Sequence, residues 1–177
     1  MSGIVVVETA RLLVRQWVPD DWKRLLPLAT DPQVLQYIGN REPWSEERVR
    51  KFVEGGIAMS ASRGWVLWPL ICKDDAELIG FCGFNGGFPP DVEIGWWLRP
   101  AYWGRGLATE AATAVMDYGF TTFGFPRLIS VAQPANKRSL RVMEKLGMVF
   151  DRQFTHEGIE VVAYAKPRPN EQPTARP

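Results

Sequence analysis

The sequence predicts one α+β domain, in which a mixed sheet is flanked by helices. Three observations favour this fold class: an opening strand is followed by helical periodicity, a two-residue period typical of strands appears in the middle, and strands then alternate with helices. The length of 177 residues fits one ordinary domain. We expect residues 1–166 to form it, with the Pro-rich segment 167–177 as a flexible tail.

In the first third of the chain, a strand is expected at residues 11–16 and three helices after it. Each helix opens on Asp or Ser, residues that favour a helix N-terminus, and the helices span about 20–29, 31–38 and 45–62. Further strands are expected at 65–72, 78–84, 92–98, 128–132, 149–154 and 159–165, and helices at 106–123 and 137–146. Pro69 implies an edge or a bulge in its strand, and the glycines and prolines of 86–90 indicate a loop.

Composition excludes several classes of protein. The chain is 46% hydrophobic and 23% charged, which is typical of a globular protein. Lys and Arg number 21 against 20 Asp and Glu, so no basic excess points to direct nucleic-acid binding. No apolar run approaches the roughly 20 residues that cross a bilayer, and the start lacks the features of a signal peptide. We therefore expect a cytoplasmic protein without membrane contact.

The two cysteines predict neither a disulfide nor a metal site. Cys72 and Cys82 fall on neighbouring strands of a hairpin, where each faces a different partner. They do not have the spacing of metal ligands, and no other metal cluster is evident. We expect both thiols to be reduced and to fill the core.

The most informative motif is a glycine-rich turn between a predicted strand and a long helix. It comprises Trp103, Gly104, Arg105, Gly106, Leu107, Ala108 and Thr109. Glycines allow close approach to a ligand, and the free N–H groups of a helix start favour phosphate, to which Arg105 could add a charge-assisted contact. A connection without a ligand is the competing interpretation. Thr109 replaces the third glycine of a dinucleotide-binding turn, and the Gly-Lys-Ser/Thr of a nucleotide-triphosphate loop is absent, so both of these alternatives are weak.

Together with the strand before it, this turn resembles the acetyl-CoA motif of the GNAT N-acetyltransferases. Residues 9–15, 136–139 and 144–148 resemble further motifs of the RimJ/RimL branch, whose members acetylate protein N-termini. The resemblance spans residues 8–165 and implies a largely antiparallel, splayed sheet of about seven strands. Where the family usually has Gln or Arg at the start of its phosphate motif, this chain has Trp103, which matters little if backbone amides bind the phosphates.

The resemblance also implies the donor and its binding residues. Acetyl-CoA would lie on residues 103–109, backbone N–H groups near Trp97 and Leu98 would hold the acetyl carbonyl and pantetheine, and Asn136 would bind pantetheine. Alternatively, Asn136 is an ordinary turn residue. No metal is implied, and the amine would attack the thioester directly.

Acetyl transfer requires a base for the amine and a proton for the leaving thiolate. Glu93 is the first candidate base, with a solvated or ion-paired carboxylate as the alternative. His156, the only histidine, falls at an expected hairpin tip, where exposure is the simpler interpretation. Many GNAT enzymes carry an acidic tyrosine where this chain has Met143, so Ser139 is the candidate proton donor, unless it merely caps a helix.

The acceptor is less well specified. The resemblance favours a protein N-terminal α-amine, ribosomal or other. A small amine such as a polyamine, amino sugar or antibiotic is the alternative, as is a CoA-binding module without catalysis. Trp44, next to Pro43 and ahead of a helix, is the candidate substrate contact. An exposed edge strand could support a homodimer.

Overall fold

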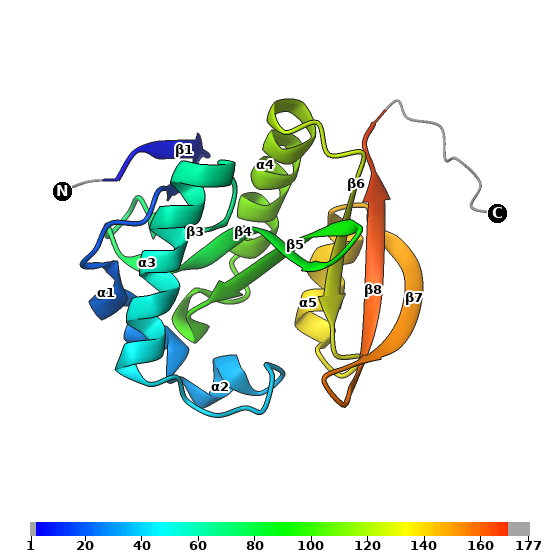
Figure 1. The fold of residues 1–177 in the computed structure, drawn as a ribbon, viewed down its shortest axis with the longest axis horizontal. Helices are drawn as coiled ribbons and strands as arrows, with labels where there is room; N and C mark the ends of the chain where they lie inside the picture. Colours follow the sequence, from blue (N-terminus) through cyan, green and yellow to red (C-terminus); the bar gives the residue numbers. More distant parts are fainter. Residues whose placement is uncertain (1–2, 170–177) are drawn as a thin grey trace.

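The computed structural model describes residues 3–169, and these form one mixed eight-stranded sheet in the order β1-β2-β3-β4-β5-β6-β8-β7 (Figure 1). Every neighbouring pair is antiparallel except β5 and β6, which are parallel. The strands are β1 (Val5–Glu8), β2 (Leu12–Arg15), β3 (Leu67–Cys72), β4 (Leu78–Phe88), β5 (Asp91–Leu98), β6 (Arg127–Ala132), β7 (Val149–His156) and β8 (Ile159–Pro167). The predicted fold class is confirmed.

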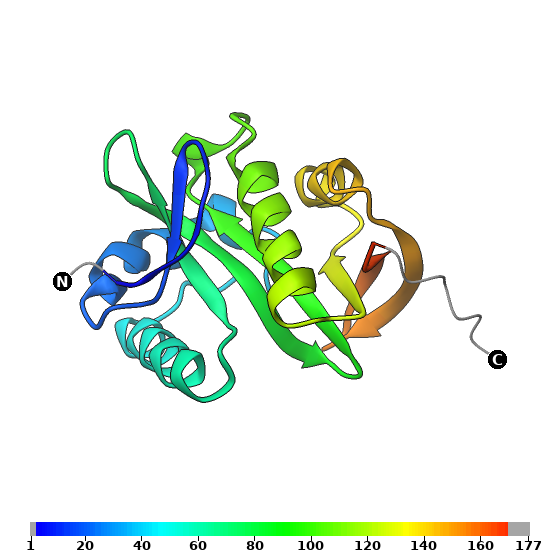
Figure 2. The ribbon, with the colours of Figure 1, turned by 90° about the horizontal axis from the view of Figure 1, so that it is seen from above.

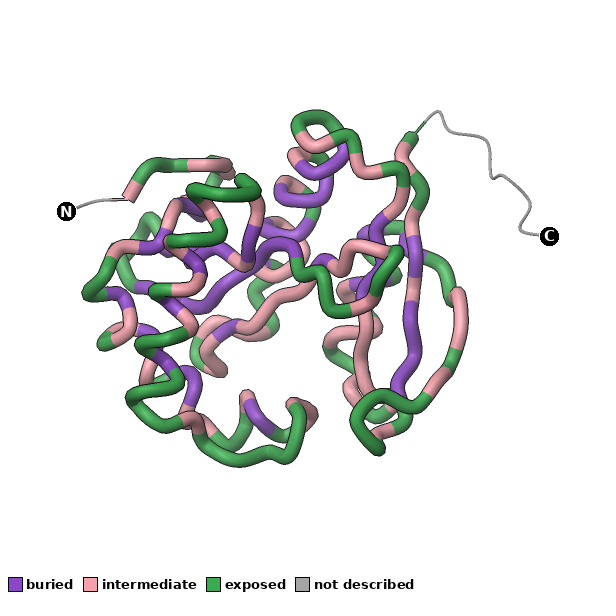
Figure 3. Tube along the Cα trace, viewed as in Figure 1, coloured by how far each residue is buried: buried purple, intermediate pink, exposed green. Residues whose placement is uncertain are grey.

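The helices cover both faces of this sheet. They are α1 (Asp21–Ala29), α2 (Pro32–Leu35), α3 (Glu46–Arg63), α4 (Leu107–Thr122) and α5 (Lys137–Lys145), with a short 3₁₀ turn, η1 (Pro100–Tyr102). Seen from above, α4 and α5 lie on one face and α3 on the other (Figure 2). The buried positions gather in the central strands and α4, whereas the hairpin tips are exposed (Figure 3).

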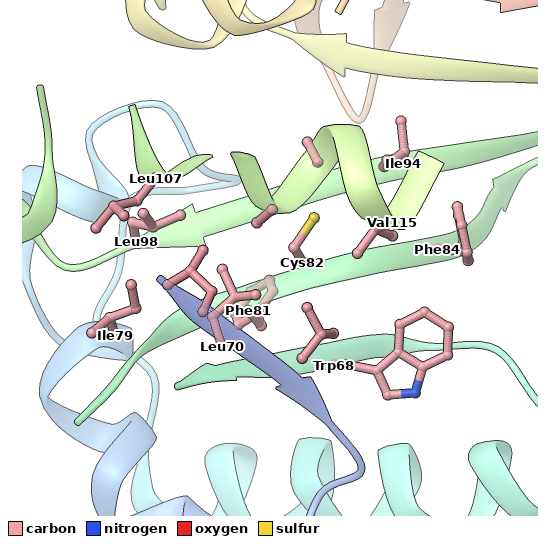
Figure 4. Packing of buried hydrophobic residues seen from close by; sticks show 14 of the residues in the cluster. Trp68, Leu70, Ile79, Phe81, Cys82, Phe84, Ile94, Leu98, Leu107 and Val115 are labelled. Carbon is pink, nitrogen blue, oxygen red and sulfur yellow. The ribbon is translucent and has the colours of Figure 1, made fainter. Parts of the chain in front are cut away.

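The core fills both faces of the sheet, and one part of it lies beneath α4. Leu98 of β5 and Leu107 of α4 meet there, and Cys82 and Val115 fill the neighbouring space (Figure 4). Both cysteines are buried and free, as the sequence predicts. Burial raises the pKa of the Cys82 thiol well above its usual range, so this thiol stays protonated.

Several element boundaries differ from the prediction. Strand β1 was not expected, because a short run of valines at a sheet edge shows no alternation of apolar and polar residues. Strand β4 continues to Phe88 through most of the predicted 86–90 loop, since pairing with β5 resumes at Phe88 and Asp91 after an irregularity. Two residues at the start of the predicted tail are tied to the fold: Pro167 ends β8, and the Arg168 N–H donates to the Pro126 carbonyl at 2.9 Å. Residues 170–177 lie outside the described residues.

Pro69 does not lie on an edge. Its strand, β3, pairs on both sides, with β2 and with β4, and a register shift follows between Leu70 and Ile71. The bulge interpretation is therefore the correct one, because an irregular ladder tolerates a residue that has no N–H to donate.

The feature that positions the site is the fork between β5 and β6. The two strands pair only at Val92–Leu128 and Glu93–Ile129. Beyond Glu93, β5 continues beside β4 while β6 continues beside β8, so the two halves of the sheet separate toward α2 (Figure 1). The predicted splay is confirmed, and it begins at the candidate base.

Candidate active site

A cavity of about 460 Å³ lies against the glycine-rich turn. Gly104 and Gly106 have φ angles of 72° and 77°, a left-handed conformation that favours glycine. Gly106 is the N-cap of α4 without a side-chain hydrogen bond, and the helix ladder begins only with the Glu110 N–H donating to the Gly106 carbonyl. The N–H groups of residues 107–109 therefore precede the ladder, and all three residues line this space, which we call the turn cavity.

The charge in the turn cavity comes from α5. Arg138, Arg141 and Lys145 line it, and no Asp or Glu does among the described residues. Arg138 lies over the Trp103 ring, 4.3 Å from its centroid. The side chain of Arg105 lies outside the cavity, with Nη2 3.8 Å from Asp74 Oδ2. Three cations and the uncapped start of α4 fit a ligand that carries several phosphates.

The motifs of the sequence did not single out the basic residues of α5 as phosphate-binding, although their spacing could have indicated it. Positions 138, 141 and 145 have the spacing of one helix face, where side chains three and four residues apart are neighbours.

The second part of the site is the open edge of β5. The Arg99 N–H donates to the Ile79 carbonyl on β4 at 2.7 Å, and successive amides of a strand alternate sides. The amides of Trp96 and Leu98 therefore face the fork, whereas that of Trp97 faces β4. The Leu98 carbonyl accepts a hydrogen bond from Trp103 Nε1 at 2.8 Å, which ties this edge to the turn.

A second cavity, of about 520 Å³, occupies the fork itself, and we call it the fork cavity. Glu93, Asn85, Ser130 and His156 are among its polar lining residues. It shares six lining residues with the turn cavity: Tyr37, Ile38, Trp96, Trp97, Asn136 and Ser139. The two cavities thus meet beside β5, so one ligand on the turn and another in the fork would come together at Trp96, Asn136 and Ser139.

Glu93 is the titratable group best placed for proton transfer. Burial raises its pKa to about 7, even though hydrogen bonds from the Val131 backbone N–H and the Asn85 side chain act in the opposite direction. Asn85, directly across on β4, donates through Nδ2 to Glu93 Oε2 at 3.3 Å. A carboxylate with a pKa near neutrality can accept a proton and release it at physiological pH.

Ser139 lies where the two cavities meet, in the first turn of α5. The cap of this helix is Asn136, whose Oδ1 accepts from the Ser139 backbone N–H at 3.2 Å. The alternative that Ser139 caps the helix is therefore wrong, and its hydroxyl remains available to the cavities that it lines. Met143 is fully buried and lines the fork cavity, where its thioether has no proton to give.

His156 is exposed at the end of β7, as predicted. It nevertheless lines the fork cavity, where its ring packs against that of Phe88 with centroids 4.8 Å apart. The β4–β5 and β7–β8 hairpins therefore meet at the rim of this cavity.

The structure gives Trp44 a different place from the one expected. Its ring packs edge-on against Trp97 and Phe52, with centroids 5.2 and 5.4 Å away, and it lines neither cavity. Trp44 thus supports Trp97 from outside the cavities. The segment ahead of it approaches the fork instead: Tyr37 and Ile38 line both cavities, and Gln133 Nε2 donates to the Tyr37 carbonyl at 3.0 Å.

Residues 3–169 offer neither a membrane-spanning helix nor a cluster of metal ligands. No helix in this part of the chain is long and apolar enough to cross a membrane. No group of three or more His, Cys, Asp or Glu side chains within it could hold a metal ion.

A splayed sheet with a glycine-rich, phosphate-binding type of turn beside the fork is typical of acyl-transferring enzymes. Comparison with known proteins identifies the family. The sequence model described as "Acetyltransferase (GNAT) domain" matches residues 11–149. The chain belongs to this family and is an N-acetyltransferase.

Its relatives include an uncharacterized N-acetyltransferase, YnaD, of Bacillus subtilis, 36% identical over 80% of this chain and 81% of the relative. The ribosomal-protein-serine acetyltransferase of Escherichia coli is 31% identical over 60% of each chain. A spermidine N(1)-acetyltransferase of the same organism is 37% identical over 34% of this chain and 32% of its own length.

Solved structures show the same fold. A GNAT-family acetyltransferase from Bacillus anthracis superposes with a TM-score of 0.80 at 31% identity, covering 92% of this chain and 98% of that one. RimL, a ribosomal L7/L12 α-N-protein acetyltransferase solved in complex with coenzyme A, gives a TM-score of 0.78 at 20% identity, covering 92% and 97%.

Proposed function

We propose that this enzyme transfers the acetyl group of acetyl-CoA to a protein N-terminal α-amine by direct attack on the thioester. The observation that carries the proposal is the place of Glu93. A carboxylate with a pKa of about 7 lines the fork cavity, which meets the cationic turn cavity beside β5. Donor and acceptor would enter from different cavities and meet at the shared wall.

The turn cavity fits the diphosphate and phosphate groups of coenzyme A. The uncapped amides of residues 107–109 would donate to the diphosphate, and Arg138, Arg141 and Lys145 would balance the remaining negative charge. Asn136 and the open edge of β5 would hold pantetheine, since they line the route from the turn to the fork.

In the reaction, Glu93 accepts a proton from the amine, and the free amine nitrogen attacks the thioester carbon. The backbone amides of Trp96 and Leu98 stabilise the negative charge that develops on the carbonyl oxygen. The carbon–sulfur bond then breaks as the nitrogen loses its second proton, and Ser139 takes up that proton while it delivers its own to the thiolate. An α-amine has a pKa near 8, well below that of a lysine side chain. A base with a pKa of about 7 therefore deprotonates an α-amine more readily than it deprotonates a lysine amine.

The apolar part of the fork cavity's lining favours a protein N-terminus over a polyamine. Glu93 and Glu157 are the carboxylates among its described lining residues, and apolar walls such as Phe88, Ile159 and Val161 make up much of the remainder. A substrate with one amine and an uncharged body fits this lining better than one with several cations. The similarity to a ribosomal-protein-serine acetyltransferase points the same way.

A small amine is the second candidate, because the chain also resembles a spermidine acetyltransferase over about a third of its length. Release of CoA thiol from acetyl-CoA would be measured with peptides starting in Ser, Ala or Met, with the same peptides blocked at the α-amine, and with spermidine and an aminoglycoside. We expect turnover with the free peptides alone. Turnover with spermidine and none with any peptide would overturn the protein substrate in favour of the small amine.

A further inference from the structure

Arg11, just ahead of β2, reaches across to the glycine-rich turn. Its Nη1 donates to the backbone carbonyl of Arg105 at 2.9 Å. Its Nε donates to Glu110 Oε2 at 2.7 Å, and its own backbone N–H donates to Glu110 Oε1 at 2.9 Å. One residue thus joins the start of β2, the turn and the first turn of α4, although 94 residues separate it from Arg105.

The contact with Arg105 fixes the orientation of one peptide group. Because a trans peptide points its C=O and N–H in opposite directions, a carbonyl held by Arg11 sends the Gly106 N–H away from Arg11. Gly106 lines the turn cavity, whereas Arg11 lines neither cavity. Glycine amides rotate easily, and around Gly104 nothing lies within 4 Å of the position a Cβ would take. The hydrogen bond from Arg11 therefore restrains the Arg105–Gly106 peptide, whereas Trp103 is held separately by the Leu98 carbonyl.

The contact with Glu110 has an electrostatic consequence. Burial alone would raise the pKa of Glu110, but hydrogen bonds from Thr9 and Arg11 lower it overall, so the side chain is ionised. Thr9 Oγ1 donates to Glu110 Oε1 at 2.6 Å, and Arg11 Nη2 lies 2.6 Å from Oε2. A carboxylate in the first turn of α4 would repel an anion bound at that helix start, and the guanidinium cancels this charge.

We propose that Arg11 is a positioning residue for the diphosphate of acetyl-CoA: it holds the Arg105–Gly106 peptide in the orientation that binds anions, and it neutralises Glu110. The inference rests on the proposed binding of the donor at the turn. It assigns Arg11 no contact with the donor, so its whole effect passes through the turn and Glu110.

The test compares coenzyme A with pantetheine, which lacks the diphosphate. Binding of both to the wild-type protein and to Arg11→Gln would be measured by calorimetry, and kcat/KM with acetyl-CoA and with S-acetylpantetheine. We expect Arg11→Gln to weaken coenzyme A about tenfold or more and to leave pantetheine unchanged. The KM for acetyl-CoA should rise while kcat at saturation stays the same.

Lys73→Gln is the matched control, because Lys73 donates to the Thr9 carbonyl and pairs with Glu8 without touching the turn. Arg11→Lys keeps the charge and loses the forked contact, so its affinity for coenzyme A should lie between those of Arg11→Gln and the wild type. This variant replaces Arg11→Gln in the test if the Gln variant does not fold. Adding Glu110→Gln to Arg11→Gln should recover part of the lost affinity.

If Arg11→Gln loses affinity for coenzyme A and for pantetheine equally, Arg11 has only a structural role. If the variant binds coenzyme A as well as the wild type does, Arg11 has no part in donor binding. Both outcomes leave the proposed function intact. A wild-type protein that does not bind coenzyme A would overturn the proposed function and this inference together.

Discussion

Glu93 of β5 and Ile129 of β6 form the last pair of partners between these two parallel strands, and the fork opens directly beyond them. The Glu93 carboxyl group therefore accepts hydrogen bonds from Asn85 and Val131 of the neighbouring strands, and it also lines the fork cavity. This position explains why its pKa is raised while it still faces a cavity that can receive an amine.

Glu93→Gln should remove the base without changing the shape of the side chain. We expect kcat/KM to fall by about 10²- to 10⁴-fold, the range of general-base catalysis. For the wild type, kcat/KM should rise with pH through about 7, where Glu93 loses its proton, and again near 8, where the amine loses its proton. The variant should retain only the second rise. A step near pH 7 that survives the substitution would show that another group is the base.

The same carboxyl group should make stability depend on pH. Its pKa is about 7 in the folded protein and 4.5 for an unperturbed glutamate side chain, so folding favours the protonated form. The stabilising contribution is complete below pH 4.5 and is lost as pH rises through 7. Urea unfolding of Glu93→Gln and wild type should show a difference that grows in favour of the variant over this window, on the order of 1–3 kcal/mol. A difference that does not change with pH would mean that the pKa is normal.

Ser139→Ala separates catalysis from capping. Because Asn136 caps α5, we expect the variant to melt at the wild-type temperature and to lose roughly tenfold or more in kcat. Asn136→Ala is the comparison: it removes the cap and should cost about 1 kcal/mol of stability. If Ser139→Ala retains full kcat, the thiolate obtains its proton from elsewhere, for example from water.

Gly106→Ala tests the turn. Its φ of 77° costs an alanine roughly 1–2 kcal/mol, and the turn can relieve this strain by rotating its amides out of place. We expect the dissociation constant for coenzyme A to rise about tenfold, as measured by calorimetry. Gly158→Ala is the matched control, with a φ of 78°, open space around it and a place in the β7–β8 hairpin away from the turn. Equal affinities in the two variants would remove the turn from donor binding.

The possible homodimer stays a prediction. Both edge strands carry exposed apolar side chains, among them Val5 in β1 and Val149 and Phe150 in β7. Exposed edges of this kind can pair with a second chain, but they do not specify a partner.

Much of the fold follows from local pattern. The two-residue period predicts most strands, and Ser45 and the glycines around 106 predict where helices begin, because these signals depend on backbone geometry within a few residues. Motif order was enough to predict the family. Strand β1 and the extension of β4 could not be predicted, because pairing partners far along the chain decide where a strand ends.

The sequence by itself determined the turn, the candidate base and the serine, since each belongs to a short motif. Only the tertiary structure decided which groups surround these residues. In the folded chain Arg138, and not Arg105, lies beside the turn cavity, Trp44 packs against Trp97 outside both cavities, and Arg11 pairs with Glu110. The physical reason is that charge, burial and hydrogen bonding at a site come from neighbours in space, which a fork between two strands assembles from distant parts of the chain.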